Sequence, residues 1–131
     1  MNEKRDARSV EAEFEIIDIK ETEYESPAEG PRLTRMTIRK RYRGVIDGTG
    51  VAEVLTAQGE GGGGYVASER LDGTLDARSG TFVIQHNGVA DGAEQSSSGN
   101  IVPNSGTGEL ASIAGQAMEK QYQVLTLIYT L

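Results

Sequence analysis

The sequence has 131 residues, a formal net charge of −7 at pH 7 and no cysteine. A chain of this length folds most simply as one domain, while its negative charge excludes general nucleic-acid binding and the lack of cysteine excludes disulfides and thiolate chemistry. No apolar run approaches the roughly 18 residues that a membrane span needs, so we expect a soluble, cytoplasmic protein with no membrane partner.

The chain opens with charged residues and then alternates. Residues 1–8 lack periodicity, so we expect a flexible tail there and a domain over 9–131. From Val10 to Ile16, apolar residues alternate with glutamates 11, 13 and 15, which is the period of a β-strand. The polar segment 20–31 predicts a long loop. Residues 33–46 predict a second strand, with Met36, Ile38, Lys40 and Tyr42 on one face.

The other face of this second strand carries arginines 35, 39, 41 and 43. The first two strands form a hairpin, so we expect these arginines to pair with the glutamates or to be solvated. A dimer surface is the alternative.

The pair Asp47-Gly48 predicts a two-residue type I′ turn after the second strand. If Ile46 pairs with Thr49 across that turn, Tyr42 lies opposite Glu53 and Lys40 opposite Leu55. Both polar members of these pairs would then face the interior.

Residues 58–64, QGEGGGG, predict a flexible loop before a strand that begins at Tyr65. Closing that loop with Ala57 opposite Tyr65 would place Glu53 opposite Glu69. The turn at 76–79 leads into a strand over 81–88, and pairing Leu75 with Gly80 places Glu69 opposite His86, the single histidine. A slip of one residue would put Glu69 and His86 on opposite faces.

The last third of the chain predicts the closing strands. Residues 90–102 are rich in serine and glycine and hold one strand, and Leu110 and Ile113 predict a single helical turn. Residues 116–131 predict two more strands. Seven or eight strands in up-and-down order bury their apolar face best by closing into a barrel.

Four motifs resemble an uncharacterised bacterial domain-of-unknown-function family: LTR at 33–35, K-x-Y-x-G at 40–44, ERLDGTLDARSGTFVIQH at 69–86 and VPNSGTGELASIAG at 102–115. This resemblance implies an all-β fold similar to allene oxide cyclase, a single eight-stranded antiparallel β-barrel that is often dimeric. It names no reaction. Where the family tends to carry glycine in G-T-L-D-G-R-S-G, this chain has Ala77.

The candidate site is an inward-facing polar set beside an apolar lining. We expect a small, largely apolar molecule to bind inside the barrel, with Glu69 and His86 moving a proton and Lys40 or Tyr42 stabilising an oxyanion. This describes a cyclase or isomerase without a cofactor. The catalytic candidates are Glu69, His86, Glu53, Lys40 and Tyr42, and the ligand-binding candidates are Met36, Ile38, Leu55, Tyr65, Leu71, Phe82 and Ile84.

Other interpretations stay open. The polar set could be a buried ion network in a non-catalytic binding, structural or interaction barrel, because such networks form without doing chemistry. A metal held by Glu53, Glu69 and His86 is disfavoured, since one histidine and no cysteine leave few suitable ligands. SGTGEL lacks the G-K-[ST] ending of a phosphate-binding loop. We therefore expect no metal and no cofactor, and the family resemblance implies a homodimer.

Overall fold

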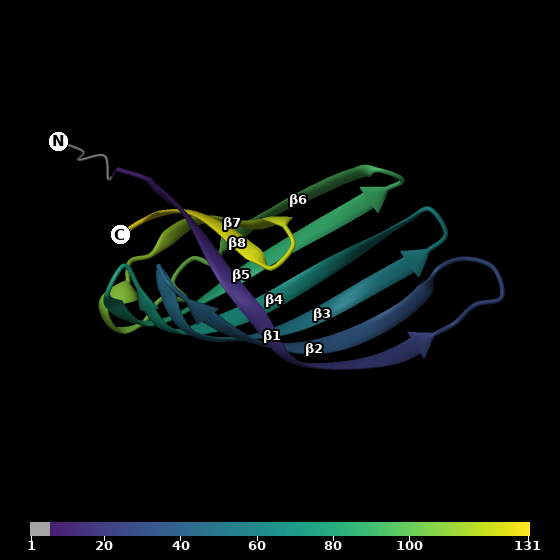
Figure 1. Cartoon of the computed structure of the whole chain (residues 1–131), viewed down its shortest axis with the longest axis horizontal. Coiled ribbons are helices and arrows are strands. Elements are labelled where there is room, and N and C mark those ends of the chain that lie inside the picture. The colour runs from purple at the N-terminus through teal and green to yellow at the C-terminus, as the bar shows by residue number, and fades with distance from the viewer. Residues whose placement is uncertain (1–5) are drawn as a thin grey trace.

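The chain forms a ring of eight antiparallel strands. The computed structural model describes residues 6–131. Each strand pairs with the next along the chain, and β8 pairs with β1 to complete the ring (Figure 1). The elements are β1 (Arg8–Glu25), β2 (Arg32–Arg43), β3 (Ile46–Gly59), β4 (Gly62–Leu75), β5 (Arg78–Asp91), β6 (Glu94–Ile101), the 3-10 turn η1 (Gly108–Leu110), β7 (Ala114–Gln121) and β8 (Val124–Thr130).

This architecture confirms the prediction of an all-β fold with one short helical turn. The first five residues of the expected tail at 1–8 lie outside the described part of the chain, and β1 begins at Arg8. Within residues 6–131 there is no helix whose length and apolar character would let it cross a membrane.

The strands differ in length, so the ring is closed over only part of its extent. β3, β4 and β5 have 14 residues each, whereas β7 has eight and β8 has seven. The hairpin ends of β1–β2, β3–β4 and β5–β6 project beyond β7 and β8 (Figure 1). We call the part enclosed by all eight strands the closed end, and the projecting part the open extension.

Two apolar clusters lie along the inner face. The larger one fills the closed end and includes Leu71, Phe82 and Ile84, each at most 2% exposed. The smaller one, in the open extension, consists of Ala52, Val54 and Ala67, with Met36, Ile38 and Tyr65 packed against it. Large side chains therefore fill the closed end, while the buried side chains of the cluster in the extension are small.

The β2–β3 turn differs from the prediction. It lies at Gly44 and Val45, and Gly48 is in β3, opposite Tyr42. Gly44 has a φ of 105°, which glycine adopts readily. A side chain on Gly48 would collide with the backbone of Asp72 and Gly73. Gly48 is thus required for close strand contact, not for a turn.

The corrected register reverses which β3 side chains face inward. Tyr42 pairs with an even-numbered residue, so Ala52 and Val54 point inward and Glu53 and Leu55 point outward. The predicted pairs Tyr42–Glu53 and Lys40–Leu55 are wrong. An odd-numbered shift of register exchanges the two faces of a strand.

The β4–β5 turn is also tighter than predicted. It consists of Asp76 and Ala77, with φ values of 50° and 67°, and Leu75 pairs with Arg78. Glu69 therefore lies opposite Ile84, not opposite His86, which lies opposite Ala67. The shift is by two residues, so both side chains keep the inward direction that the sequence predicted.

Two predicted loops belong largely to strands. β1 continues to Glu25, through the first half of the expected loop at 20–31. The glycine-rich segment 58–64 is a tight hairpin in which Gly59 pairs with Gly62, so Glu53 pairs with Ser68 and not with Glu69. The arginine stripe pairs in part as expected, since Arg43 Nη1 lies 2.9 Å from Glu15 Oε1 on the outside.

Candidate functional site

Five polar side chains meet inside the ring, at the boundary between the two apolar clusters. We call Lys40, Tyr42, Glu69, His86 and Glu119 the polar cluster; they come from β2, β4, β5 and β7. Each inward position before and after Lys40 and Glu69 on its strand belongs to one of the two apolar clusters or packs against it. The charged side chains thus lie inside the ring at the boundary between the closed end and the open extension.

Glu69 is the anchor of the polar cluster. It is fully buried, and its two carboxylate oxygens accept hydrogen bonds from Lys40 Nζ at 2.7 Å and from the Tyr42 hydroxyl at 2.6 Å. Gly50 lies opposite Lys40, where any side chain would collide with Glu69 and Tyr42. Burial of a carboxylate is tolerated because a cation and a hydroxyl donor both compensate for lost water.

Lys40 joins two carboxylates. Its ammonium donates to Glu69 and, at 3.0 Å, to Glu119 Oε1, and it lies 4.2 Å from the centre of the Phe14 ring. Burial alone would lower the pKa of Lys40, but the charges of Glu69 and Glu119 outweigh burial and raise it. Lys40 is therefore a cation at neutral pH. For Tyr42, burial and the neighbouring Glu69 raise the pKa well above its ordinary value, so its hydroxyl stays protonated.

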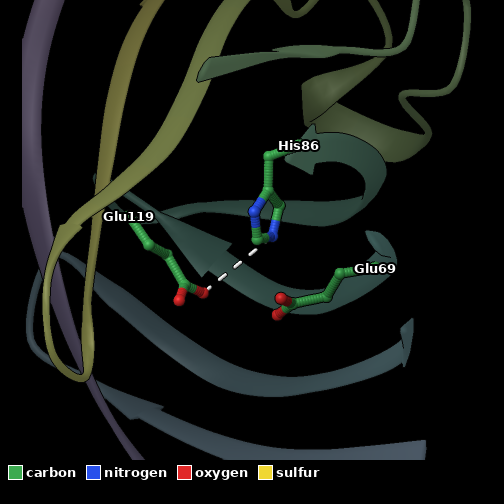
Figure 2. A group of neighbouring side chains, drawn as sticks. All are labelled: Glu69, His86 and Glu119. Atoms are coloured by element: carbon green, nitrogen blue, oxygen red, sulfur yellow. Dashed lines mark ion pairs between the residues drawn. The ribbon is translucent and has the colours of Figure 1, made fainter. Parts of the chain in front are cut away.

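His86 is buried and bonded through only one nitrogen. Its Nδ1 lies 3.0 Å from the Tyr65 hydroxyl. Its Nε2 has no hydrogen-bond partner among the described residues, and the nearest carboxylate oxygen, Glu119 Oε1, is 3.9 Å away (Figure 2). Burial lowers the pKa of His86 although the charge of Glu119 opposes it, so the imidazole is neutral at pH 7.

The tautomer of His86 follows from its neighbour. Burial raises the pKa of Tyr65, so its hydroxyl keeps its proton. A phenol oxygen shares its lone pair with the ring, which makes the hydroxyl a better donor than acceptor. We therefore assign Tyr65 as the donor to Nδ1, which places the imidazole hydrogen on Nε2. With this assignment, the buried nitrogen without a partner is an N–H donor, and the nearest carboxylate oxygen to it is Glu119 Oε1 at 3.9 Å.

A pocket of about 680 Å³ adjoins the polar cluster on the open extension. Tyr65 and Glu119 line it, together with Gly88 and Ala90 of β5. Gly88 is needed there because a side chain would collide with the Tyr65 ring. The same two residues that contact His86 and Lys40 thus form part of the pocket wall.

Glu69, His86 and Glu119 are also spaced as metal ligands could be, since one ligand atom from each lies within 4.8 Å of the others (Figure 2). The Lys40 ammonium, however, lies within hydrogen-bond distance of both carboxylates. A divalent cation would have to share this small space with a buried positive charge. The donor set therefore fits its own lysine better than a metal.

The structure brings together four of the five predicted catalytic residues. Lys40, Tyr42, Glu69 and His86 meet as expected, whereas Glu53 lies on the outer face and accepts a hydrogen bond from Thr37 at 2.9 Å. Sequence reasoning missed Glu119. A register irregularity between Met118 and Gln121 interrupts the alternation of β7, so no local pattern marks Glu119 as facing the interior.

The predicted lining residues divide among three places. Leu71, Phe82 and Ile84 pack in the closed end, and Leu55 is 43% exposed on the outer face. The inner face of the open extension holds the others, Met36, Ile38 and Tyr65.

Fold and site define this chain as a small ring of antiparallel strands with a buried charged cluster beside a pocket. The chain belongs to the family described as protein of unknown function (DUF3224), whose sequence profile matches residues 10–125. None of the curated proteins compared with the chain matches it.

A solved structure is similar over nearly the whole chain. It is the 1.84 Å crystal structure of a protein of unknown function from the DUF3224 family of Shewanella oneidensis MR-1, with 28% identity and a TM-score of 0.81. The similarity covers 96% of this chain and 98% of that one. The expected resemblance to an uncharacterised domain family is thus confirmed.

Proposed function

We propose that this protein binds a small, largely apolar molecule on the inner face of its open extension. The observation that carries this proposal is the pocket of about 680 Å³ whose wall includes Glu119 of the polar cluster and Tyr65, which is bonded to His86. Its volume lies within the ~300–1,000 Å³ typical of small-molecule sites. Convergent polar groups beside an apolar surface are also typical of such sites.

The side chains of the extension support an apolar ligand. Tyr65 of the pocket wall packs against the apolar cluster of Ala52, Val54 and Ala67, which Met36 and Ile38 also contact. The cluster of the closed end, by contrast, is built from larger side chains such as Leu71 and Phe82. We also propose that the ring is a barrel similar to that of allene oxide cyclase, and that the protein forms a homodimer.

Probe binding tests this function. We expect N-phenyl-1-naphthylamine, a neutral apolar dye, to gain fluorescence on binding the wild-type protein. Ala90→Phe places a ring in the pocket and is expected to weaken binding at least tenfold, whereas Ala114→Phe, at an exposed position of β7, leaves it unchanged. Absence of saturable binding, or equal binding by both variants, contradicts the proposal.

Acid–base catalysis without a cofactor, as in a cyclase or isomerase, is a second candidate, favoured by the neutral imidazole beside a carboxylate at the pocket. Because both carboxylate oxygens of Glu69 accept bonds, from Lys40 and Tyr42, whereas Glu119 accepts one bond from Lys40, Glu119 would take the proton and His86 Nε2–H would stabilise an oxyanion. Exchange of the α-hydrogens of 2-tetralone in D₂O, followed by NMR, tests this. An exchange rate no higher with the wild-type protein than with Glu119→Gln would contradict the catalytic proposal.

A further inference from the structure

From the polar cluster we infer that the ligand carries a neutral hydroxyl group, and that His86 and Glu119 recognise it as a donor–acceptor pair. This inference rests on the proposed binding function and specifies the chemistry of the ligand. Its apolar body would occupy the pocket and its hydroxyl would reach the polar cluster between these two side chains. Because His86 Nε2 is fully buried and His86 is not part of the pocket wall, this contact requires a small movement of the Glu119 side chain, which lines the pocket and is 23% exposed.

The first step is the unsatisfied nitrogen. Buried polar atoms in folded proteins nearly always have a hydrogen-bond partner, and the exceptions require an explanation. His86 is 5% exposed, and its Nε2 is the buried side-chain nitrogen or oxygen that lacks a partner within residues 6–131. An N–H left unpaired in this way costs about 1–3 kcal/mol, which a ligand oxygen could recover on binding.

The second step is the acceptor that faces this donor. Glu119 Oε1 lies 3.9 Å from Nε2, beyond hydrogen-bond range, and the Glu119 side chain is 23% exposed beside the pocket. One oxygen atom can lie about 2.8 Å from both atoms at once, which is hydrogen-bond distance. A hydroxyl placed there accepts from Nε2–H and donates to the carboxylate, so both partners are satisfied.

The third step excludes a carboxylate ligand. With His86 neutral, Lys40 carries one positive charge against the two negative charges of Glu69 and Glu119. Lys40 is not free to bind an anion, because Glu69, Glu119 and the Phe14 ring surround its ammonium. A ligand carboxylate would therefore meet net negative charge and no available cation.

The fourth step excludes an ammonium ligand. An ammonium group has only donors. It could bind Glu119, but its hydrogens would face Nε2–H, and the nitrogen would stay unpaired. The net negative charge of the cluster thus disfavours a carboxylate, and the unpaired Nε2–H disfavours an ammonium. A hydroxyl can accept from Nε2–H and donate to the Glu119 carboxylate.

Four probes with one apolar body test this inference: 1-naphthalenemethanol, 1-methylnaphthalene, 1-naphthoate and 1-naphthylmethylamine, each titrated by calorimetry at pH 7. We expect the alcohol to bind about tenfold more tightly than the methyl compound, because it adds hydrogen bonds to otherwise unpaired groups. The carboxylate and the amine are expected to bind more weakly than the alcohol.

Variants assign the preference to the two residues. His86→Phe keeps a ring but removes the donor, and is expected to reduce the preference for the alcohol over the methyl compound to about one. Glu119→Gln removes the negative charge and is expected to improve naphthoate binding at least fivefold. Glu11→Gln, which removes the same charge from an exposed position of β1, serves as the matched control and should leave the probe order unchanged.

The outcomes separate this inference from the proposed function. If all four probes bind with equal affinity, or naphthoate binds most tightly, hydroxyl recognition is wrong while ligand binding stands. If the order is as expected but persists in both His86→Phe and Glu119→Gln, the recognition lies elsewhere and the inference fails. If no probe and no dye binds, the proposed function itself is wrong, and this inference with it.

Discussion

Lys40 has the most consequential side chain of the polar cluster. It neutralises the buried Glu69, ties Glu119 of β7 to β2, and is itself 5% exposed at its side chain. Removing one partner of a buried ion pair leaves an uncompensated charge, which is far more costly than losing a pair in water. The residue that organises the site therefore also contributes to stability.

Lys40→Met is expected to lower the free energy of unfolding by about 3–5 kcal/mol, because Glu69 keeps its Tyr42 bond but loses its cation. Urea denaturation at pH 7 measures this. The control is Arg43→Met, which breaks an ion pair with Glu15 that is more than 60% exposed on both sides and should cost about 0–1 kcal/mol. Equal losses in the two variants would contradict a stabilising role for the buried pair.

The hairpin turns are the elements that set which residues meet. The β4–β5 turn places both Asp76 and Ala77 at positive φ, and a residue with a β-carbon is strained there. Asp76 offsets part of this cost, since it accepts a hydrogen bond from the Tyr129 hydroxyl and pairs with Arg8 at 3.0 Å. Burial and the bond to Asp76 raise the pKa of Tyr129 to about 12, so this bond persists across the neutral range.

Ala77→Gly is expected to raise the free energy of unfolding by up to about 1 kcal/mol, because glycine adopts a φ of 67° without steric strain. The comparison is Ala114→Gly in β7, where the backbone has an ordinary strand conformation and glycine should instead cost about 0.5–1 kcal/mol. Thermal unfolding of both variants decides the matter. A loss of stability in Ala77→Gly would show that the turn tolerates alanine without strain.

At the scale of the whole molecule, the ring consists of a filled end and an extension with a thinner core. Within residues 6–131, fifteen buried residues form the cluster of the closed end, against three in the extension. β7 and β8 cover only the closed end (Figure 1). Regions with few buried contacts open at lower free energy than the global unfolding reaction, which suits a surface that must admit a ligand.

Hydrogen exchange should reveal this division. We expect the slowest amides in β8 and in the parts of β4 and β5 around Leu71 and Ile84, and faster exchange toward the β1–β2 and β5–β6 hairpin ends. Mass spectrometry of peptides from exchanged protein measures this. Equal protection along the full length of β4 and β5 would show that the extension is as stable as the closed end.

The alternation of side chains along each strand was enough to predict an all-β fold and the inward direction of Lys40, Tyr42, Glu69 and His86. Alternation is a local property of extended backbone, so a charged residue that interrupts an apolar face can be recognised from the sequence of one strand. The same local information failed at Glu53, because its direction depends on the β2–β3 register.

Tertiary structure alone decided the registers and the membership of Glu119. Asp47-Gly48 has favourable turn chemistry, but close contact between Gly48 and β4 requires that glycine within a strand. Glu119 reaches Lys40 from 79 residues away only because β8 pairs with β1 and the ring closes. Turn position and ring closure depend on packing between distant segments, and those contacts, unlike strand alternation, are not encoded in any short stretch of sequence.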